Sequence, residues 1–313
     1  KAEIVLFESS SVWGGVIRSE PTQDFLWEGG PDSFVSHKPE ALELCRQLGL
    51  EGELVRTPSR HRQAYVLSGE KLYAFPSNRS AFLKTPLLSW KGRFRAVLEP
   101  LIGASGLDDE SVSDFIVRRL GREVAEKIFE PLVVGVYGGD PAQLSIRSTL
   151  PHLYQAERSR GSFTKALLQM VEPMKLKGSG RKKESLLSLK KGMAELVKRL
   201  VERLPGYVDL RLQAPVSEVT RVKGRFRVRV GEEAEDFDTV ILATSASSSA
   251  QLVLSAFPEV ARLLQGVPYV SAVIVAFGYD EEVLDGRTGT GFLVPPSEGK
   301  IMSACTWVNQ KFP

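Results

Sequence analysis

The sequence predicts an α/β fold in which sheet strands lie on both sides of a helical insertion. Residues 4–7 form a continuous apolar run that ends in the acid Glu8, and such a run is typical of a parallel strand covered on both faces. A second apolar run, residues 237–246, ends in small residues and predicts another buried strand. Between them, residues 81–180 have the apolar periodicity of helices.

The position of Glu8 at the end of the first strand suggests a role in binding a ligand. In a dinucleotide-binding βαβ unit, a carboxylate at the end of the second strand accepts hydrogen bonds from the hydroxyls of an adenosine ribose. The glycine-rich phosphate loop expected about 20 residues earlier is not present, since the sequence begins at Lys1. We therefore expect the chain to be a fragment, with the loop in residues that precede it.

Local signals predict the elements that follow in order. Residues 39–49 begin with proline and end with glycine, which indicates a helix. Residues 64–75 are typical of a hairpin with its turn at a Ser-Gly pair. Residues 192–204 indicate another helix. Two alternating segments after it predict strands: residues 208–219 and 224–231.

The helical insertion has its clearest signal in residues 108–137. This stretch starts with acidic and serine residues that can cap a helix. Its apolar residues then recur at helical spacing: Phe115, Ile116, Leu120 and Val124. Residues 175–185 are glycine-rich and basic and lack apolar periodicity, so they indicate a surface loop.

Composition excludes several classes of function. A net charge of +3 is too small to indicate a nucleic-acid-binding protein, and no apolar run is long enough to span a membrane. Cys45 and Cys305 are far apart in sequence, which is typical of a protein from a reducing compartment such as the cytoplasm. The histidines lack metal-ligand spacing, so we expect no metal site: His37, His61 and His152.

No side chain stands out as an acid, base or nucleophile, and we predict no catalytic residue. An enzyme with such a sequence would leave its chemistry to a cofactor. The glycine pairs at 14–15 and 29–30 would let the backbone approach a pyrophosphate closely. Ordinary turns are an equally good interpretation of the same pairs.

Four segments together resemble the FAD-dependent porphyrinogen oxidases of haem biosynthesis, which belong to the amine-oxidase-like flavoproteins. The segments are VLFESSSVWGGVIRS, WEGGPDSF, EPLVVGVYGGDPAQLSIRSTLP and GTGFLVP…SACTWVNQKFP. They occur in the order of the family and extend along essentially the whole chain. The resemblance implies a Rossmann-like FAD-binding sheet with a substrate domain and a helical insertion. It also implies that further flavin contacts lie outside these residues, so that this fragment alone is inactive.

The resemblance implies how the chain divides. Residues 1–58 and 181–262 would form the FAD-binding domain, residues 59–80 and 263–313 the substrate domain, and residues 81–180 the helical insertion. In the family this insertion also meets the membrane surface. The segment LLSWKGRFRAVLEPLIG suits an interfacial helix because it mixes apolar and basic residues: Trp90, Lys91, Arg93, Phe94, Arg95, Leu98 and Leu101. Packing of this helix on its own domain is the alternative.

The family pattern places the adenosine ribose on Glu8, with Ser9 beside it, and a backbone contact to adenine on Val216. The pyrophosphate and the flavin ring would lie along two loops: Gly14, Gly15 and Val16, and Gly30, Pro31, Asp32 and Ser33. The substrate slot would be lined by four residues: Gly135, Leu293, Thr306 and Trp307. For the apolar residues, simple core packing is an equally good interpretation.

The activity that the resemblance implies is the oxygen-dependent oxidation of a porphyrinogen to a porphyrin. The SACTW pattern resembles the branch that oxidises coproporphyrinogen III. Ala64 stands where the protoporphyrinogen branch commonly has an arginine, with Arg62 on the same face of the predicted strand. Protoporphyrinogen IX is the alternative substrate, and another amine-oxidase-like flavin reaction is a further alternative. The family also implies handover of the product to a ferrochelatase-type enzyme.

Overall fold

The structure is a computed structural model that describes residues 2–36, 39–162, 164, 186–204, 206–279, 283–284 and 286–312. The chain divides into two compact units. The first unit contains Lys1–Arg56 and Glu184–Gly278, and the second contains Thr57–Lys183 and Tyr279–Pro313. The loop predicted in residues 175–185 lies outside the described residues, as does His37. The five-segment division by function remains a prediction.

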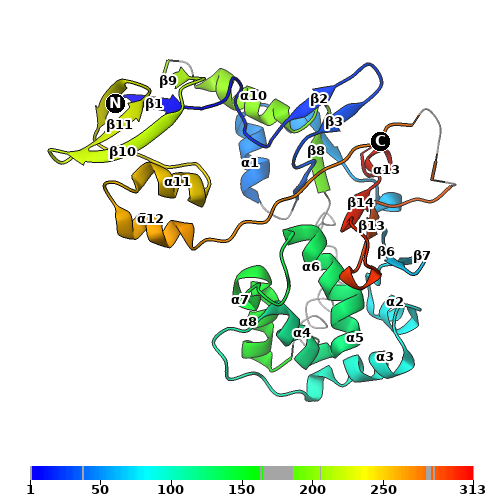
Figure 1. The fold of residues 1–313 in the computed structure, drawn as a ribbon. Coiled ribbons are helices and arrows are strands. Elements are labelled where there is room, and N and C mark those ends of the chain that lie inside the picture. The colour runs from blue at the N-terminus through cyan, green and yellow to red at the C-terminus, as the bar shows by residue number, and fades with distance from the viewer. Residues whose placement is uncertain are drawn as a thin grey trace. The chain divides into compact units, whose positions relative to one another are not determined.

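In its described residues, the strands of the first unit pair in several small sheets (Figure 1). Strand β1 pairs in parallel with β9, as in a βαβ unit. Strands β10, β11 and β12 form an antiparallel meander, while β2–β3 and β4–β8–β5 form the other sheets. The bounds are β1 Ile4–Phe7, β2 Ser19–Pro21, β3 Leu26–Glu28, β4 Phe34–Val35, β5 Leu54–Arg56, β8 Leu186–Leu189, β9 Val208–Arg211, β10 Val216–Val222, β11 Arg225–Val230 and β12 Glu233–Phe237.

The helices of the first unit confirm two of the predicted helices, namely α1 and α10. The first turn of α1 begins at Pro39, whose missing N–H is not needed there. The helix then buries Cys45 against Leu50 and Leu189. Helices α11 and α12 pack against the β10–β12 meander. The bounds are α1 Pro39–Gln47, α10 Ala194–Arg203, α11 Ala246–Val253 and α12 Pro258–Gln265, with a 3₁₀ turn at Glu51–Glu53.

Two expectations for the first unit are wrong. Strand β1 forms as predicted, but it is not covered on both faces, because Ile4 is 50% exposed and Leu6 is 39% exposed. Among the described residues β9 is its one strand partner. The strand predicted at 237–246 does not form, since β12 ends at Phe237 and Ile241 is 88% exposed. An apolar run forms a strand only where its backbone hydrogen-bonds to a neighbouring strand. Within the described part of the chain, no strand pairs with this run.

The second unit contains a four-stranded sheet in the order β14–β13–β6–β7. Strands β6 and β7 form the predicted hairpin, and its turn places Gly69 at φ +64°. Strand β13 lies parallel to β6, and β14 returns antiparallel to β13. Glycine is needed at position 291, because a Cβ there would collide with the carbonyl oxygen of Cys305. The bounds are β6 Ala64–Ser68, β7 Lys71–Ala74, β13 Gly291–Leu293 and β14 Ala304–Thr306.

Helices form most of the rest of the second unit (Figure 1). Several begin with a side chain that accepts a hydrogen bond from a backbone N–H of the first turn: Asn78, Ser89, Ser111 and Ser145. The bounds are α2 Arg79–Lys84, α3 Trp90–Val97, α4 Val112–Leu120, α5 Arg122–Val124, α6 Glu130–Tyr137, α7 Ile146–Thr149, α8 Pro151–Arg160 and α13 Val308–Lys311, with 3₁₀ turns at Ser59–His61, Glu99–Leu101 and Pro296–Glu298.

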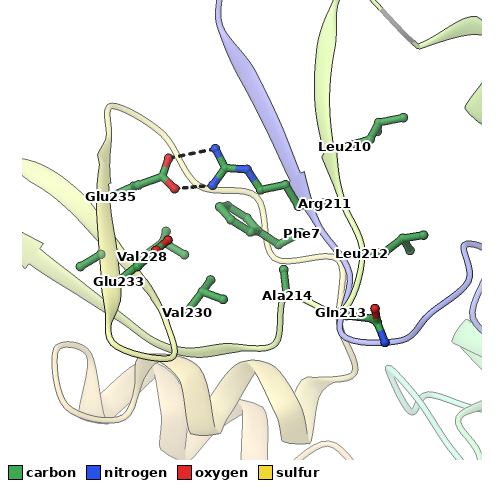
Figure 2. Close-up of a pocket in the computed structure, with 11 residues that line it drawn as sticks. Phe7, Leu210, Arg211, Leu212, Gln213, Ala214, Val228, Val230, Glu233 and Glu235 are labelled. Carbon is green, nitrogen blue, oxygen red and sulfur yellow. Dashed lines mark hydrogen bonds and ion pairs between the residues drawn. The ribbon is translucent and has the colours of Figure 1, made fainter.

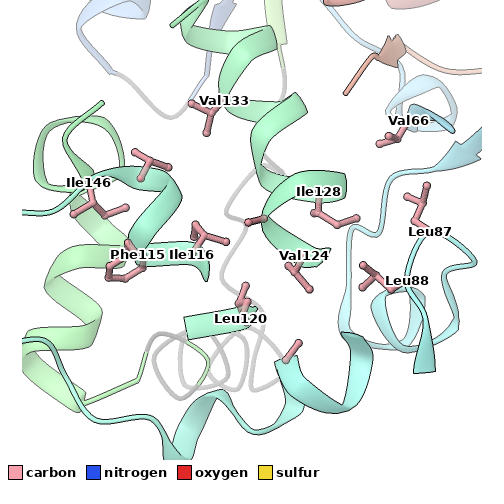
Figure 3. Packing of buried hydrophobic residues seen from close by; sticks show 13 residues of the cluster. Val66, Leu87, Leu88, Phe115, Ile116, Leu120, Val124, Ile128, Val133 and Ile146 are labelled. Carbon is pink, nitrogen blue, oxygen red and sulfur yellow. The ribbon is translucent and has the colours of Figure 1, made fainter. Parts of the chain in front are cut away.

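The core of the second unit consists of the periodic apolar residues predicted from the sequence, together with their neighbours (Figure 3). Phe115 and Ile116 are fully buried, and Leu120 is 6% exposed. Val66 brings strand β6 into the same cluster. Each such side chain stabilises the fold by about 1.5–3 kcal/mol relative to its exposure to water, so this cluster joins the sheet to the helices of its unit.

A π-helical turn, Ala125–Phe129, lies between α5 and α6. In an uninterrupted α-helix, Val133 would lie about 180° round the axis from Val124. Both side chains nevertheless belong to the same buried cluster. The wider turn accommodates an extra residue, which returns Val133 to the core side and leaves Gly135 facing away from it.

A buried charged cluster also joins helices of the second unit. Arg119 and Glu99 are both fully buried and form an ion pair, and Arg119 contacts Glu157 at 3.3 Å. Burial by itself would raise the pKa of Glu99. Hydrogen bonds from Ser162 and Thr164 and the charge of Arg119 together outweigh that effect and hold the pKa below its ordinary value.

Candidate functional site

Glu8 lies directly after β1 in the first unit. Its Oε1 accepts a hydrogen bond from the backbone N–H of Ser10 at 2.8 Å and a longer one from the hydroxyl of Ser9 at 3.3 Å. The Ser10 N–H is the main cause of a lowered pKa for Glu8, and partial burial opposes it. Glu8 is therefore a half-buried carboxylate that stays charged at neutral pH and can accept hydrogen bonds from a ligand.

Backbone hydrogen bonds tie the end of β1 to the segment that leads into β10. The N–H of Glu8 donates to the carbonyl of Arg211, and the N–H of Ala214 donates to the carbonyl of Glu8, each at 2.9 Å. Val216 begins β10 shortly afterwards. Glu8, Ser9 and Val216, which are far apart in the sequence, therefore lie at one corner of the first unit.

A cavity of about 430 Å³ opens at this corner (Figure 2). Its wall includes an ion pair between Arg211 and Glu235, and the Arg211 guanidinium lies 5.3 Å from the ring centre of Phe7. Hydrogen bonds to Glu235 and Asp209 raise the pKa of Arg211, so it remains a cation. No local pattern in the sequence identifies these residues, because the cavity forms only where β9 meets the meander.

The predicted pyrophosphate loop and the predicted flavin turn lie against each other in the first unit. Gly14 and Gly15 have φ values of +110° and +57°, which favour glycine. A Cβ at Gly14 would lie 3.1 Å from Val197 of α10. A Cβ at Gly30 would collide with the carbonyl oxygen of Val16. Gly14 and Gly30 therefore allow close packing of the two loops and of α10, whereas a Cβ at Gly15 would meet nothing within 4 Å.

The residues after Gly30 continue along the same loop. Pro31 is exposed, whereas Asp32 and Ser33 are half-buried and lead into β4. The hydroxyl of Ser33 donates a hydrogen bond to Oδ1 of Asp32 at 2.7 Å. This hydrogen bond joins two neighbouring side chains of the loop between β3 and β4.

Glu28, which the sequence analysis did not select, attaches this loop to α10. Its Oε1 accepts a hydrogen bond from the N–H of Met193 at 2.8 Å, and its Oε2 accepts one from the hydroxyl of Ser19 at 2.7 Å. The oxygen of Ser19 in turn accepts a hydrogen bond from the N–H of Ala194 at 2.9 Å. The glycine turn after β3 is thereby held at the first turn of α10. No local pattern identifies Glu28, since its partners are distant in sequence.

The predicted substrate residues all lie in the second unit, and two of them are in contact. A Cβ at Gly135 of α6 would lie 2.7 Å from Cδ2 of Leu293 in β13. Thr306 is exposed at the end of β14, where its strand pairs with Gly291. Trp307 is only 8% exposed, so its ring is mainly a packing element of the unit.

Arg62 does not have the predicted orientation. Strand β6 begins at Ala64. Arg62 instead follows the 3₁₀ turn Ser59–His61 with a helical conformation, φ −84° and ψ −4°. Because Arg62 is outside the strand, the alternation of strand faces does not apply to it. Arg62 and Ala64 therefore do not share one face of a strand, and that prediction is wrong.

The described residues contain no group of three or more His, Cys, Asp or Glu side chains able to hold a metal ion. In that same part of the chain, no helix is both long and apolar enough to cross a membrane. Cys45 and Cys305 are free thiols, and burial raises the pKa of both.

A family model described as flavin containing amine oxidoreductase matches residues 2–311. The chain belongs to this family. As a flavin-containing amine oxidoreductase it is an oxidoreductase with a flavin cofactor. A solved structure of a cyclohexylamine oxidase from Brevibacterium oxydans shares the fold, with a TM-score of 0.56 at 16% identity over 84% of this chain and 58% of that one.

More similar relatives carry the names of porphyrinogen oxidases. The coproporphyrinogen III oxidase of Bacillus subtilis is 31% identical, over 99% of this chain and 68% of that protein. The protoporphyrinogen oxidase of Homo sapiens is 30% identical over the same shares of both proteins. A solved structure from Exiguobacterium, assigned as a protoporphyrinogen oxidase, has a TM-score of 0.79 at 26% identity, over 99% of this chain and 68% of that one.

Proposed function

We propose that this protein oxidises a porphyrinogen to a porphyrin in haem biosynthesis, with coproporphyrinogen III as substrate and FAD as cofactor. The observation that carries this proposal is the 31% identity to the Bacillus subtilis coproporphyrinogen III oxidase over 99% of this chain. Protoporphyrinogen oxidases match at 30% identity. Protoporphyrinogen IX is therefore the competing substrate, and the experiment must compare the two.

FAD suits the residues gathered in the first unit. Glu8 offers a charged acceptor to ribose hydroxyls at the carboxyl end of a parallel strand. Val216 and the adjoining cavity lie at the same corner and suit the adenine end. Gly15 leaves open space beside the backbone where a pyrophosphate would approach, since a Cβ there would meet nothing within 4 Å. When bound, a flavin accepts hydride equivalents from the substrate.

The residues of the chain would bind and orient the reactants rather than exchange protons. The contact between Gly135 and Leu293 offers an apolar surface without a titratable group. Such a surface would hold the macrocycle edge and exclude water from it. We include molecular oxygen in the proposal as the final electron acceptor, and a ferrochelatase-type enzyme as the recipient of the porphyrin.

We expect the full-length gene product to have a higher kcat/KM for coproporphyrinogen III than for protoporphyrinogen IX. Arg60 precedes β6 in the sequence and Lys71 begins β7, the strand that follows. Both side chains are exposed and add diffuse positive charge. Such charge favours a substrate with four carboxylates over one with two. The measurement is the appearance of porphyrin fluorescence under air for both substrates at one salt concentration, with the rate without enzyme subtracted.

Each outcome of that assay has a distinct meaning. A preference for protoporphyrinogen IX would contradict the substrate assignment and leave the reaction class intact. If neither porphyrinogen is oxidised faster than in the absence of enzyme, the porphyrinogen proposal is wrong.

We further propose that α3 makes peripheral contact with a membrane surface. Trp90 is 71% exposed, Phe94 61% and Val97 49%, and their spacing of four and three residues places them on one side of α3. Leu101, which is 79% exposed, lies in the 3₁₀ turn that follows. Arg93 and Arg95 donate hydrogen bonds to carbonyls of their own unit. The exposed side of α3 therefore offers mainly its apolar side chains to a membrane. An interfacial helix binds through such an apolar side.

Phe94→Glu is expected to weaken sedimentation of the protein with phosphatidylglycerol vesicles by about tenfold, since it removes one apolar anchor and adds a repelled charge. Leu263→Glu is the matched control, because Leu263 is 68% exposed on α12 of the first unit. Equal effects of the two substitutions would contradict a specific role for α3.

A further inference from the structure

Three segments of the second unit meet at the side chain of Tyr65. The residue lies in β6, opposite Phe292 of β13. Its hydroxyl donates a hydrogen bond to the carbonyl of Thr288 at 2.9 Å, and its ring centre lies 5.6 Å from that of Trp307. Tyr65 therefore contacts both the chain that enters β13 and the residue that follows β14.

Gly289 brings the backbone directly against these rings. A Cβ at Gly289 would lie 2.9 Å from Cε2 of Tyr65 and 3.3 Å from Cζ3 of Trp307. Trp307 also packs against Phe292, with ring centres 6.3 Å apart. The position of the buried Trp307 ring is thus determined by Tyr65, Phe292 and the glycine backbone together.

Tyr65 pairs with β13 and contacts Trp307 directly after β14, and both strands carry residues of the proposed substrate slot. Leu293 is the last residue of β13, and Thr306 is the last residue of β14, directly before Trp307. The two strands are held together by a ladder that pairs Leu293 with Ala304. A shift of the Tyr65 ring would therefore move Leu293 and Thr306 together.

We propose that Tyr65 is a positioning residue of the substrate slot. Its hydroxyl fixes the chain ahead of β13, and its ring fixes Trp307 behind β14, so that Leu293 and Thr306 face the porphyrinogen. This inference rests on the proposed function. Tyr65 acts through its neighbours and takes no part in the transfer of electrons or protons.

Two substitutions in the full-length gene product separate the roles of the hydroxyl and the ring. Tyr65→Phe removes the hydrogen bond to Thr288, and its KM for coproporphyrinogen III is expected to rise about threefold. Tyr65→Leu removes the ring as well, and its KM is expected to rise about tenfold or more. In both variants kcat should change by less than about twofold. Bound flavin per chain should be unchanged, because the flavin-binding residues lie in the first unit. Tyr73→Phe, in the neighbouring strand β7, is the matched control and should leave KM unchanged.

Gly135→Val distinguishes failure of this inference from failure of the proposed function. Its side chain would collide with Leu293, so KM should rise whenever these two residues line the slot. If Gly135→Val raises KM and both Tyr65 variants leave it unchanged, the positioning role is wrong and the proposed function stands. If Gly135→Val leaves KM unchanged, the proposed slot is wrong and the inference falls with it. If Tyr65→Leu does not fold, Tyr65→Phe alone decides the question.

Discussion

Replacement of Arg119 by methionine is expected to lower the free energy of unfolding of the second unit by about 3–5 kcal/mol, because the carboxylate of Glu99 would stay buried without its partner. Both side chains are fully buried. Urea unfolding followed by circular dichroism measures the loss. Arg122→Met is the matched control, since its side chain is 78% exposed and its ion pair with Glu126 spans 3.7 Å. The control should lose less than about 0.5 kcal/mol. Equal losses of unfolding free energy in the two variants would show that the buried Arg119 pair contributes no more stability than the exposed Arg122 pair.

The pH dependence of the same loss is a second test. The pKa of Glu99 is lowered in the folded chain, so its ionised form contributes stability above its unfolded pKa. That contribution is lost as the pH falls through the folded pKa. Without Arg119 the buried carboxyl should have a raised pKa, and acidification would then neutralise the unpaired charge. The gap in unfolding free energy between the two proteins should therefore shrink in acid. A gap that stays constant from neutral to acid pH would contradict this account.

Replacement of Glu8 by alanine is expected to weaken FAD binding to the full-length gene product by about 1.5–3 kcal/mol, the contribution of hydrogen bonds to a charged acceptor. This corresponds to a rise in Kd of about 10- to 150-fold. Titration of the apoprotein with FAD, followed by flavin fluorescence, gives the two dissociation constants. The physical reason is that the Ser10 N–H holds Glu8 ionised at the strand end.

Glu3→Ala is the matched control for this prediction. Glu3 is exposed and lies directly before β1, at the opposite end of the strand from Glu8. It should leave the affinity for FAD unchanged. If Glu8→Ala also leaves it unchanged, Glu8 only ends a strand. If both variants lose affinity equally, the effect comes from net charge.

The sequence was informative wherever a signal is local. The helix of residues 39–49 and the hairpin of residues 64–75 formed as predicted. Proline, glycine and the spacing of apolar residues determine the backbone conformation only within a few positions, so their effect can be predicted from the local sequence. Glu8 is likewise recognisable, since the apolar run and its terminal acid are contiguous. These features give the end of β1 and the turns of both units.

The sequence was uninformative wherever a distant partner decides the structure. Residues 237–246 have a strand pattern, but Ile241 stays exposed because no neighbouring ladder covers it among the described residues. Arg119 lies in a helix whose pattern does not reveal that Glu99 is buried against it. The sequence around Tyr65 resembles that of any aromatic strand residue, and its role depends on contact with the distant Trp307. Roles of this kind depend on contacts between segments that no local pattern encodes.

The π-helical turn Ala125–Phe129 also affects how the length of this chain can vary. Loss of one residue from this turn would give a continuous α-helix and keep Val133 and Gly135 at their present angles, since one extra residue is what separates the two forms. The same loss within α4 or α6 would rotate every later side chain by about 100°. We therefore expect single-residue gaps between related sequences to be tolerated within this turn and to be disruptive on either side of it.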